Sequence, residues 1–276
     1  NSWGFEAGAI ANDNMFESGS TSVELKAFEY FMAKQNHPNL EGGIVIFAAG
    51  NDGKAMAGYP AAYNKLIAVS AIAPDANPTY YTCYDRGCNV SAPGGEYYRT
   101  SGSSSEAGCV ASTLPGDKYA FMQGTSMACP HVSGIAALVL SYALDNGIML
   151  TNTQLNEIIT SSVRNIDDRL TGVKPIYIGS MSLDPYKGNM GTGKIDALMA
   201  IQSVRGALCV PAHVGEEVEI NISSLLGDGN IKVTGYADYV IPAETRNRLD
   251  IKGDTYFSGK VYLTCQNAGV GVITVK

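Results

Sequence analysis

The chain has 276 residues, of which 45% are apolar and 16% are charged, and its formal net charge is −7. This apolar content is typical of a globular protein and excludes a disordered chain, while the acidic balance argues against a general nucleic-acid-binding protein. The length suits one large domain, or a large domain followed by a small one. No apolar stretch reaches the roughly 18 to 20 residues of a membrane span, and the longest, 134–144, is predicted to be a buried helix.

The first third of the chain predicts an α/β arrangement. Apolar residues recur at helical spacing over 21–35, and Pro38 ends this helix because a residue before proline disfavours the α conformation. Two continuous apolar runs follow, GIVIFAA at 43–49 and LIAVSAI at 66–72. Such runs are typical of strands that are covered on both faces of a parallel sheet.

Helices dominate the middle of the chain. Residues 125–146 predict a central helix, since its interior IAALVLSYAL is apolar nearly all round and Asn-Gly follows it. Thr151 and Gln154 have the spacing of a capping box, which predicts a second helix to about residue 163. Residues 190–204 predict a glycine-rich turn that leads into a short helix.

The pattern changes after Arg205. Apolar and polar residues alternate over 218–222, 261–265 and 270–275, between glycine and asparagine turns. Period-two alternation predicts short, half-buried strands. We therefore expect two domains, an α/β domain over 1–205 and a small all-β, sandwich-like domain over 206–276.

Two polar residues stand where chemistry is expected. Ser126 follows a glycine at the mouth of the central helix, where unpaired N–H groups and the helix dipole favour an oxyanion beside its hydroxyl. Asn51 follows a buried strand, at the sheet edge where ligands gather, and its amide is a neutral donor for developing negative charge. The plain alternatives are a helix N-cap for Ser126 and a turn residue for Asn51.

Several segments resemble the subtilisin-like peptidases (subtilases), in that family's order and spacing. They are NSWG at 1–4, AAGN at 48–51, GYPAAYNKLIAVSAI at 58–72, SAPGG at 91–95, STLPGDKYAFMQGTSMA at 112–128 with its continuation to GTSMACPHVSGIAAL, and GTGKIDALMAI at 191–201. The resemblance covers residues 1 to about 204 and implies a parallel-sheet, three-layer catalytic domain. Residues 206–276 show no comparable likeness.

The resemblance implies roles for individual residues. Ser126 matches the nucleophile, which would form an acyl-enzyme, and Asn51 matches the side-chain donor of the oxyanion hole. Two segments match the walls that hold substrate backbone by strand addition, namely Ser2, Trp3 and Gly4, and Ala48, Ala49 and Gly50. Gly58 matches a floor position of the pocket before the scissile bond, where glycine would leave room for a large side chain. Tyr81 falls near that pocket, with an exposed loop tyrosine as the alternative.

The family's catalytic Asp and His have no counterpart, because their motifs lie upstream of the segments matched here. His131 lies about 7.5 Å further along the Ser126 helix, on another face, so it cannot serve Ser126 as a base. His37 is expected at the opposite end of the sheet, and His213 belongs to the β domain. We expect that an N-terminal segment of the same precursor supplies both residues, as a separate chain or as a removed segment. The sheet of 1–205 is then incomplete at its N-terminal side.

Six cysteines, low charge and many Gly, Ser, Asn and Tyr residues favour an exported protein, either secreted, periplasmic or on the cell surface. Cys83 could pair with Cys88, and Cys109 could replace either partner. Cys209 could pair with Cys265, while Cys129 fits a buried free thiol in the serine helix. The spacing of Cys83 and Cys88 gives little support for zinc.

These features together predict a secreted serine endopeptidase that acts on peptides or proteins without an organic cofactor. Structural calcium is common in the resembled family, but the sequence shows no ligand set and no metal site is assigned. Two alternatives remain: a non-catalytic relative that binds peptides through the same groove, and a surface-binding module in residues 206–276. An Asp–His segment upstream would favour the enzyme over the first alternative.

Overall fold

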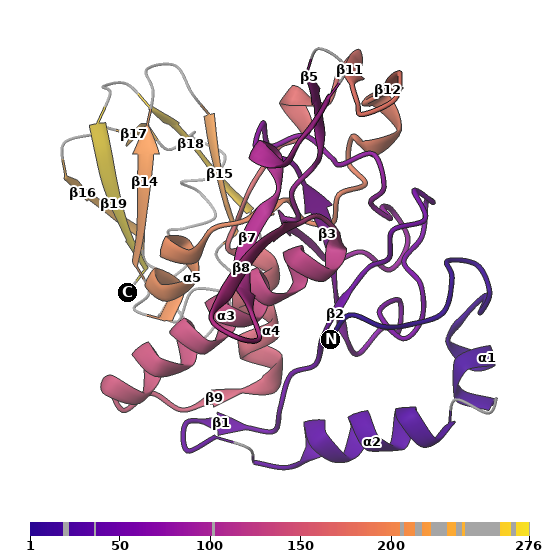
Figure 1. The fold of residues 1–276 in the computed structure, drawn as a ribbon. Helices are drawn as coiled ribbons and strands as arrows, with labels where there is room; N and C mark the ends of the chain where they lie inside the picture. The colour runs from indigo at the N-terminus through magenta and orange to yellow at the C-terminus, as the bar shows by residue number, and fades with distance from the viewer. Residues whose placement is uncertain are drawn as a thin grey trace.

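The computed structural model describes residues 1–18, 22–35, 37–100 and 103–204, and beyond them the strand segments 207–212, 217–221, 231–235, 239–240, 260–265 and 269–275. Its centre is a five-stranded sheet in the order β10-β13-β4-β3-β2. Figure 1 labels two of its strands, β2 and β3. These strands are β2 (Ile46–Ala48), β3 (Ile67–Ile72), β4 (Val90–Pro93), β10 (Val163–Arg164) and β13 (Lys194–Ile195). The strands β2, β3, β4 and β13 run parallel to one another, and β10 pairs antiparallel with β13.

Both predicted buried strands are confirmed as β2 and β3. All six residues of β3 are buried, which explains why its sequence is continuously apolar and does not alternate. Side chains of β3 alternate between the two faces: Ile67, Val69 and Ala71 join one buried cluster, and Ala68 joins another. The sheet is therefore covered on both faces, as a three-layer α/β domain requires.

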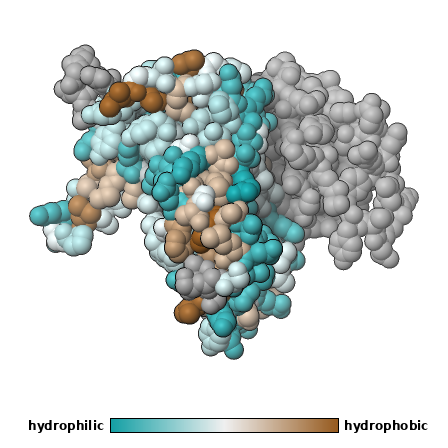
Figure 2. Space-filling model, turned by 90° about the vertical axis from the view of Figure 1, so that its right-hand side faces the viewer, coloured by the Kyte–Doolittle hydropathy of each residue, from teal (hydrophilic) through white to brown (hydrophobic). Residues whose placement is uncertain are grey.

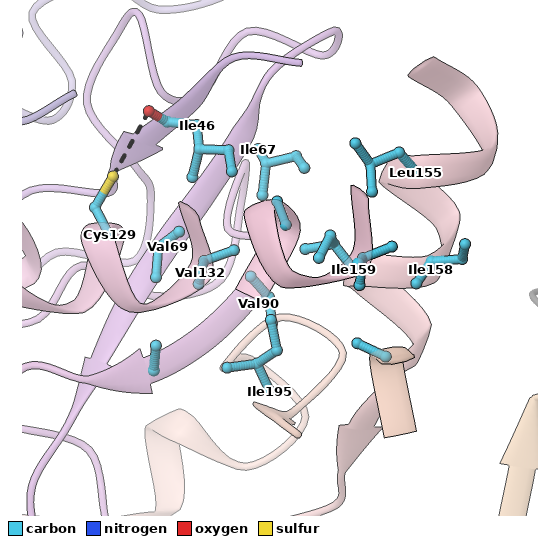
Figure 3. Close-up of a cluster of buried hydrophobic side chains, with 14 of the residues drawn as sticks. Ile46, Ile67, Val69, Val90, Cys129, Val132, Leu155, Ile158, Ile159 and Ile195 are labelled. Atoms are coloured by element: carbon cyan, nitrogen blue, oxygen red, sulfur yellow. Dashed lines mark hydrogen bonds between the residues drawn. The ribbon is translucent and has the colours of Figure 1, made fainter. Parts of the chain in front are cut away.

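Three helices cover one face of the sheet. They are α3 (Thr125–Asp145), α4 (Asn152–Ser161) and α5 (Ala197–Val204). Figure 3 shows the layer between them, where sheet residues face α3 and α4: Ile46, Ile67, Val69, Val90, Val132, Leu155, Ile158 and Ile159. Full burial of each such side chain contributes about 1.5–3 kcal/mol, so this layer is a principal source of the domain's stability.

The helices α1 (Asp13–Ser18) and α2 (Ser22–Ala33) cover the other face, where Phe16 and Leu25 pack with Phe47 of β2. The helix predicted over 21–35 is confirmed as α2, which starts one residue later and ends two residues earlier than predicted. The capping box is confirmed as well: Gln154 N donates to Thr151 Oγ1 at 3.1 Å, and Thr151 N donates to Gln154 Oε1 at 2.9 Å.

The helix predicted within 190–204 begins later than the glycine-rich turn suggests. Residues 194–195 form β13, and Gly191 and Gly193 have positive φ angles of 69° and 136°. A Cβ at Gly191 would lie 2.4 Å from the Asn89 carbonyl carbon, so glycine is required where this turn crosses the chain before β4. The helix α5 therefore starts at Ala197.

Short paired strands and 3-10 turns complete the α/β domain. The pairs are β1 (Leu40–Glu41) with β9 (Leu150–Thr151), β5 (Tyr98–Thr100) with β6 (Ser103–Ser105), β7 (Val110–Leu114) with β8 (Lys118–Met122), and β11 (Val173–Pro175) with β12 (Ser180–Ser182). The 3-10 turns are η1 (Glu106–Gly108), η2 (Asp167–Arg169) and η3 (Asp184–Tyr186). The hairpin β7–β8 leads directly to the start of α3.

Strands also occupy the C-terminal part, as the alternating pattern predicts. One antiparallel sheet has the order β14-β19-β16 and another the order β15-β18-β17. They comprise β14 (Ala207–Ala212), β15 (Glu217–Asn221), β16 (Ile231–Gly235), β17 (Tyr239–Val240), β18 (Lys260–Cys265) and β19 (Gly269–Val275). The sandwich-like packing stays a prediction. The expected boundary at residues 205 and 206, and the side chains of Cys209 and Cys265, lie outside the described residues.

The helix α3 is long and apolar enough to cross a membrane by length and composition. In this structure it packs on β2, β3 and β4, and Ala128, Val132 and Val139 are fully buried in that interface. Its outer face is open, with Leu138 52% and Leu144 45% exposed, so the prediction of a buried, central helix holds for one face only.

The described thiols are all free. Cys83 and Cys129 are buried, and Cys88 and Cys109 are partly buried. The predicted free thiol at Cys129 is confirmed, and its Sγ contacts the Ile46 carbonyl at 3.6 Å (Figure 3). The suggested pairing of Cys83 with Cys88 is wrong in this structure.

Apolar side chains also reach the surface. Figure 2 shows a face on which apolar residues, brown and tan, gather in a patch among hydrophilic residues in teal. A groove of about 420 Å³ lies between α2, α3 and the segment that enters β2. Its lining includes Phe28, Phe31, Ile44, Ala137 and Leu140. Because β2 is the last strand in the sheet order, this groove runs along an open sheet edge.

Candidate active site

The start of α3 presents Ser126 with an unpaired backbone donor. Gly124 N-caps the helix with φ at 148°, a conformation that favours glycine, and its carbonyl accepts hydrogen bonds from Met127 N and Ala128 N. Thr125 N donates to Asn51 Oδ1 at 2.9 Å. Within the described part of the chain, the Ser126 N–H is then the one donor in this first turn without an acceptor. It is available to a ligand.

Asn51 is held by its oxygen, which leaves its nitrogen without an acceptor among the described residues. Asn51 Oδ1 accepts from both Thr125 N and Thr125 Oγ1, each at 2.9 Å. A Cβ on Gly124 would lie 3.6 Å from Asn51 Nδ2 and 3.5 Å from Ser126 N. Two donors thus lie beside the space that a side chain at position 124 would occupy. This arrangement can stabilise an oxyanion.

The described histidines are engaged elsewhere. His131 Nδ1 contacts the Met127 carbonyl at 2.8 Å, one turn back along α3, and His37 Nδ1 accepts from Asn39 N at 3.1 Å. Neither contacts Ser126, as the sequence predicts, and His213 lies outside the described residues. Ser126 itself is half-buried.

The segment of Ser2, Trp3 and Gly4 is exposed beside the nucleophile candidate. Ser2 Oγ lies 3.5 Å from the Ser126 carbonyl oxygen. The Trp3 side chain is 50% exposed, and its ring packs edge-on against Phe47 at 5.3 Å. In the described structure the three backbone N–H groups have no hydrogen-bond partner. This segment can therefore add a peptide strand.

The second expected wall differs from the first. Ala49 N donates to the Val69 carbonyl and Gly50 N to Thr125 Oγ1, while their own carbonyls accept from Gly58 N and Cys83 N. The fold thus already uses the backbone of Ala49 and Gly50. These residues and Ala48 can shape a pocket wall. Of the two segments, Ser2 to Gly4 is the one whose backbone N–H groups stay free in the described structure.

Gly58 and Tyr81 have structural surroundings that the sequence does not show. A Cβ on Gly58 would lie 2.3 Å from the Phe5 carbonyl oxygen, so the chain itself requires glycine here. Its role as a pocket floor stays a prediction. Tyr81 is buried, which overturns the exposed-loop alternative, and its hydroxyl donates to the Gly95 carbonyl at 2.5 Å. Burial raises the pKa of this phenol, so it remains a donor.

Sequence reasoning missed a polar network behind the start of α3. Gln123 Oε1 accepts from Tyr97 N at 2.8 Å, and Gln123 Nε2 donates to Tyr80 Oη at 2.6 Å. Glu96 and Lys174, both buried, form an ion pair at 2.5 Å. The paired residues are far apart in the sequence and follow no periodic pattern. The one local signal is the position of Gln123, directly before the Gly-Thr-Ser turn.

Metal binding has no visible support in the part of the chain that the structure describes. No group of three or more His, Cys, Asp or Glu side chains is placed there to hold an ion. Structural calcium stays a prediction, and nothing in the site geometry requires a metal.

The fold is a three-layer α/β domain with a serine at the start of its longest helix. The chain belongs to the subtilase family, whose model matches residues 1–176. It is 31% identical over 185 residues to a thermostable alkaline protease of Halalkalibacterium halodurans, covering 67% of this chain and 39% of that protein. It is 33% identical over 132 residues to thermitase of Thermoactinomyces vulgaris, covering 48% of this chain and 39% of thermitase.

A third relative is an extracellular basic protease of Dichelobacter nodosus, 31% identical over 60% of this chain and 24% of that protein. Among solved structures, a protease of Pseudoalteromonas arctica is 29% identical with a TM-score of 0.43, covering 59% of this chain and 43% of that one. The chain therefore spans less than half the length of each of these four relatives.

Proposed function

We propose that this chain carries the nucleophile and the oxyanion hole of a serine endopeptidase. Ser126 Oγ attacks the peptide carbonyl and forms an acyl-enzyme, which water then hydrolyses. Asn51 Nδ2 and the Ser126 N–H stabilise the oxyanion. The observation that carries this proposal is the pair of free donors beside the open space at Gly124.

The substrate is a peptide or protein segment in extended form. It pairs with the exposed backbone of Ser2, Trp3 and Gly4, which supplies affinity without a sequence requirement. Ala48, Ala49, Gly50 and Gly58 bound the pocket for the side chain before the scissile bond. The reaction requires no organic cofactor.

The general base comes from a segment that leads into Asn1. Asn1 N donates to the Ile46 carbonyl at 2.8 Å, and Ala48 N donates to the Asn1 carbonyl at 2.9 Å. This is the hydrogen-bond pattern of a parallel pair, with Asn1 opposite Phe47. A segment that continues this pairing would run beside Ile44 and fill the apolar groove. It would complete the sheet and supply the Asp and His.

Secretion is part of the proposal. It is supported by the low charge of the chain and by its likeness to a relative that is named an extracellular protease. The four described cysteines are free thiols and therefore add no support to this part of the proposal.

The experiment is peptide hydrolysis by the full-length gene product and its Ser126→Ala and Ser161→Ala variants. Ser161 lies on α4 and bonds to the Glu157 carbonyl, so its variant is a matched control. We expect Ser126→Ala to abolish hydrolysis and Ser161→Ala to retain it. Peptide binding without Ser126-dependent hydrolysis would contradict the proposal and favour the non-catalytic alternative.

A further inference from the structure

The side chain of Gln123 connects three loops that surround the active site. Tyr97 N can only donate, so the atom that faces it is Gln123 Oε1, and the amide nitrogen then faces Tyr80 Oη. Tyr80 follows β3 and Tyr97 follows β4, while Gln123 directly precedes the N-cap of α3. Gly124 N adds a bond to the Gly94 carbonyl at 3.0 Å.

The far end of this connection is fixed by a buried ion pair. Tyr80 N donates to Glu96 Oε1 at 3.0 Å. Glu96 Oε2 faces Lys174 Nζ, and Lys174 Nζ also donates to the Pro78 carbonyl at 2.9 Å. Glu96 is 1% exposed and Lys174 is 4% exposed, so water does not compete for these contacts. Tyr80 is therefore a rigid anchor for Gln123.

On the opposite side, Asn51 holds the same turn through Thr125. The turn from Gln123 to Thr125 thus has polar anchors in the loops after β2, β3 and β4. Ser126 N and Asn51 Nδ2 both lie beside the space at Gly124, but Ser126 belongs to α3 and Asn51 to the loop after β2, so a shift of this turn would change the distance between the two donors. Oxyanion stabilisation depends on donors that are already in place.

We propose that Gln123 is a positioning residue for the oxyanion hole, holding the start of α3 through Tyr80 and Tyr97. This inference rests on the proposed function. It assigns to Gln123 no contact with substrate. Its contribution is expected in the transition state, where oxyanion charge develops, and not in ground-state substrate binding.

The test uses the full-length gene product and a chromogenic peptide substrate. Gln123→Met keeps the side-chain size and removes both hydrogen bonds. Gln154→Met is the matched control, since Gln154 Oε1 also accepts from a backbone N–H but lies at the start of α4. Tyr80→Phe removes one of the two bonds and serves if Gln123→Met does not fold, which circular dichroism shows.

We expect Gln123→Met to lower kcat about 10-fold with KM nearly unchanged, since displaced catalytic groups cost up to roughly 10²-fold. The inhibition constant of a peptide boronate, which presents a tetrahedral oxygen, should rise by the same factor. In an Asn51→Ala background the effect of Gln123→Met should shrink, because one of the two donors is already gone.

Three results would overturn the inference: an unchanged kcat, an equal loss in Gln154→Met, or a full additive effect in the Asn51→Ala background. Failure of the proposed function gives a different result. In that case the parent protein and its Ser126→Ala variant hydrolyse the peptide at the same rate.

Discussion

Replacing Lys174 with methionine tests the buried ion pair that fixes the loop after β3. In the parent protein Lys174 Nζ lies 2.5 Å from Glu96 Oε2, and that oxygen has no other partner in the described residues. The substitution leaves a buried carboxylate whose one remaining donor is Tyr80 N. Breaking such a pair from one side costs about 3–5 kcal/mol, a large share of the roughly 5–15 kcal/mol that stabilises a domain.

The assay is urea denaturation followed by circular dichroism. Lys65→Met is the control, because Lys65 pairs with Glu29 at 3.1 Å on the surface and its side chain is 54% exposed. A surface pair contributes about 0–1 kcal/mol. The double variant Lys174→Met with Glu96→Gln removes the uncompensated charge and should recover part of the loss. The reasoning is refuted if Lys174→Met and Lys65→Met cost the same.

Three further predictions address the site and the core. Asn51→Ala in the full-length protein should lower kcat roughly 10²–10³-fold, which is the loss known for removal of the corresponding donor in subtilisin itself; an unchanged rate would exclude Asn51 from the oxyanion hole. Gly58→Ala should lower the melting temperature, because its Cβ would lie 2.3 Å from a backbone oxygen. Gly134→Ala is the control: a Cβ there meets nothing within 4 Å and should stabilise the helix by up to about 1 kcal/mol. Equal effects of the two variants on stability would contradict the close contact at Gly58. Burial raises the pKa of Cys88 to about 12, so this thiol should resist iodoacetamide at pH 8 until urea is added, and rapid alkylation of the folded protein would refute this. The free energy of unfolding should also fall as pH rises from about 9 towards 12, because the thiol of the unfolded chain releases its proton first.

Local sequence patterns predicted the elements that depend on neighbours in the chain. The capping box of Thr151 and Gln154 closes within a single turn, so four residues contain all the information it needs. The run of β3 is equally local, since burial on both faces leaves an unbroken apolar sequence. The apolar run and the Asn-Gly that follows it placed the end of α3 to within one residue.

Long-range contacts account for what the sequence did not show. Gln123 meets Tyr80 and Tyr97 through loops that follow different strands, and no periodic pattern records such a meeting. Tyr81 resembles a loop residue in the sequence, but its ring is buried and its hydroxyl binds Gly95. The requirement for glycine at position 58 comes from the backbone of Phe5, which is far away in sequence.

The central claim is that Ser126 is a nucleophile whose base lies on a segment that leads into Asn1. Its most direct test is labelling with a fluorophosphonate, followed by peptide mapping, on the full-length gene product and on residues 1–276 alone. The account predicts one adduct, on Ser126, in the full-length protein and none in residues 1–276. Equal labelling of both proteins, labelling of another residue, or no labelling of the full-length protein would contradict it.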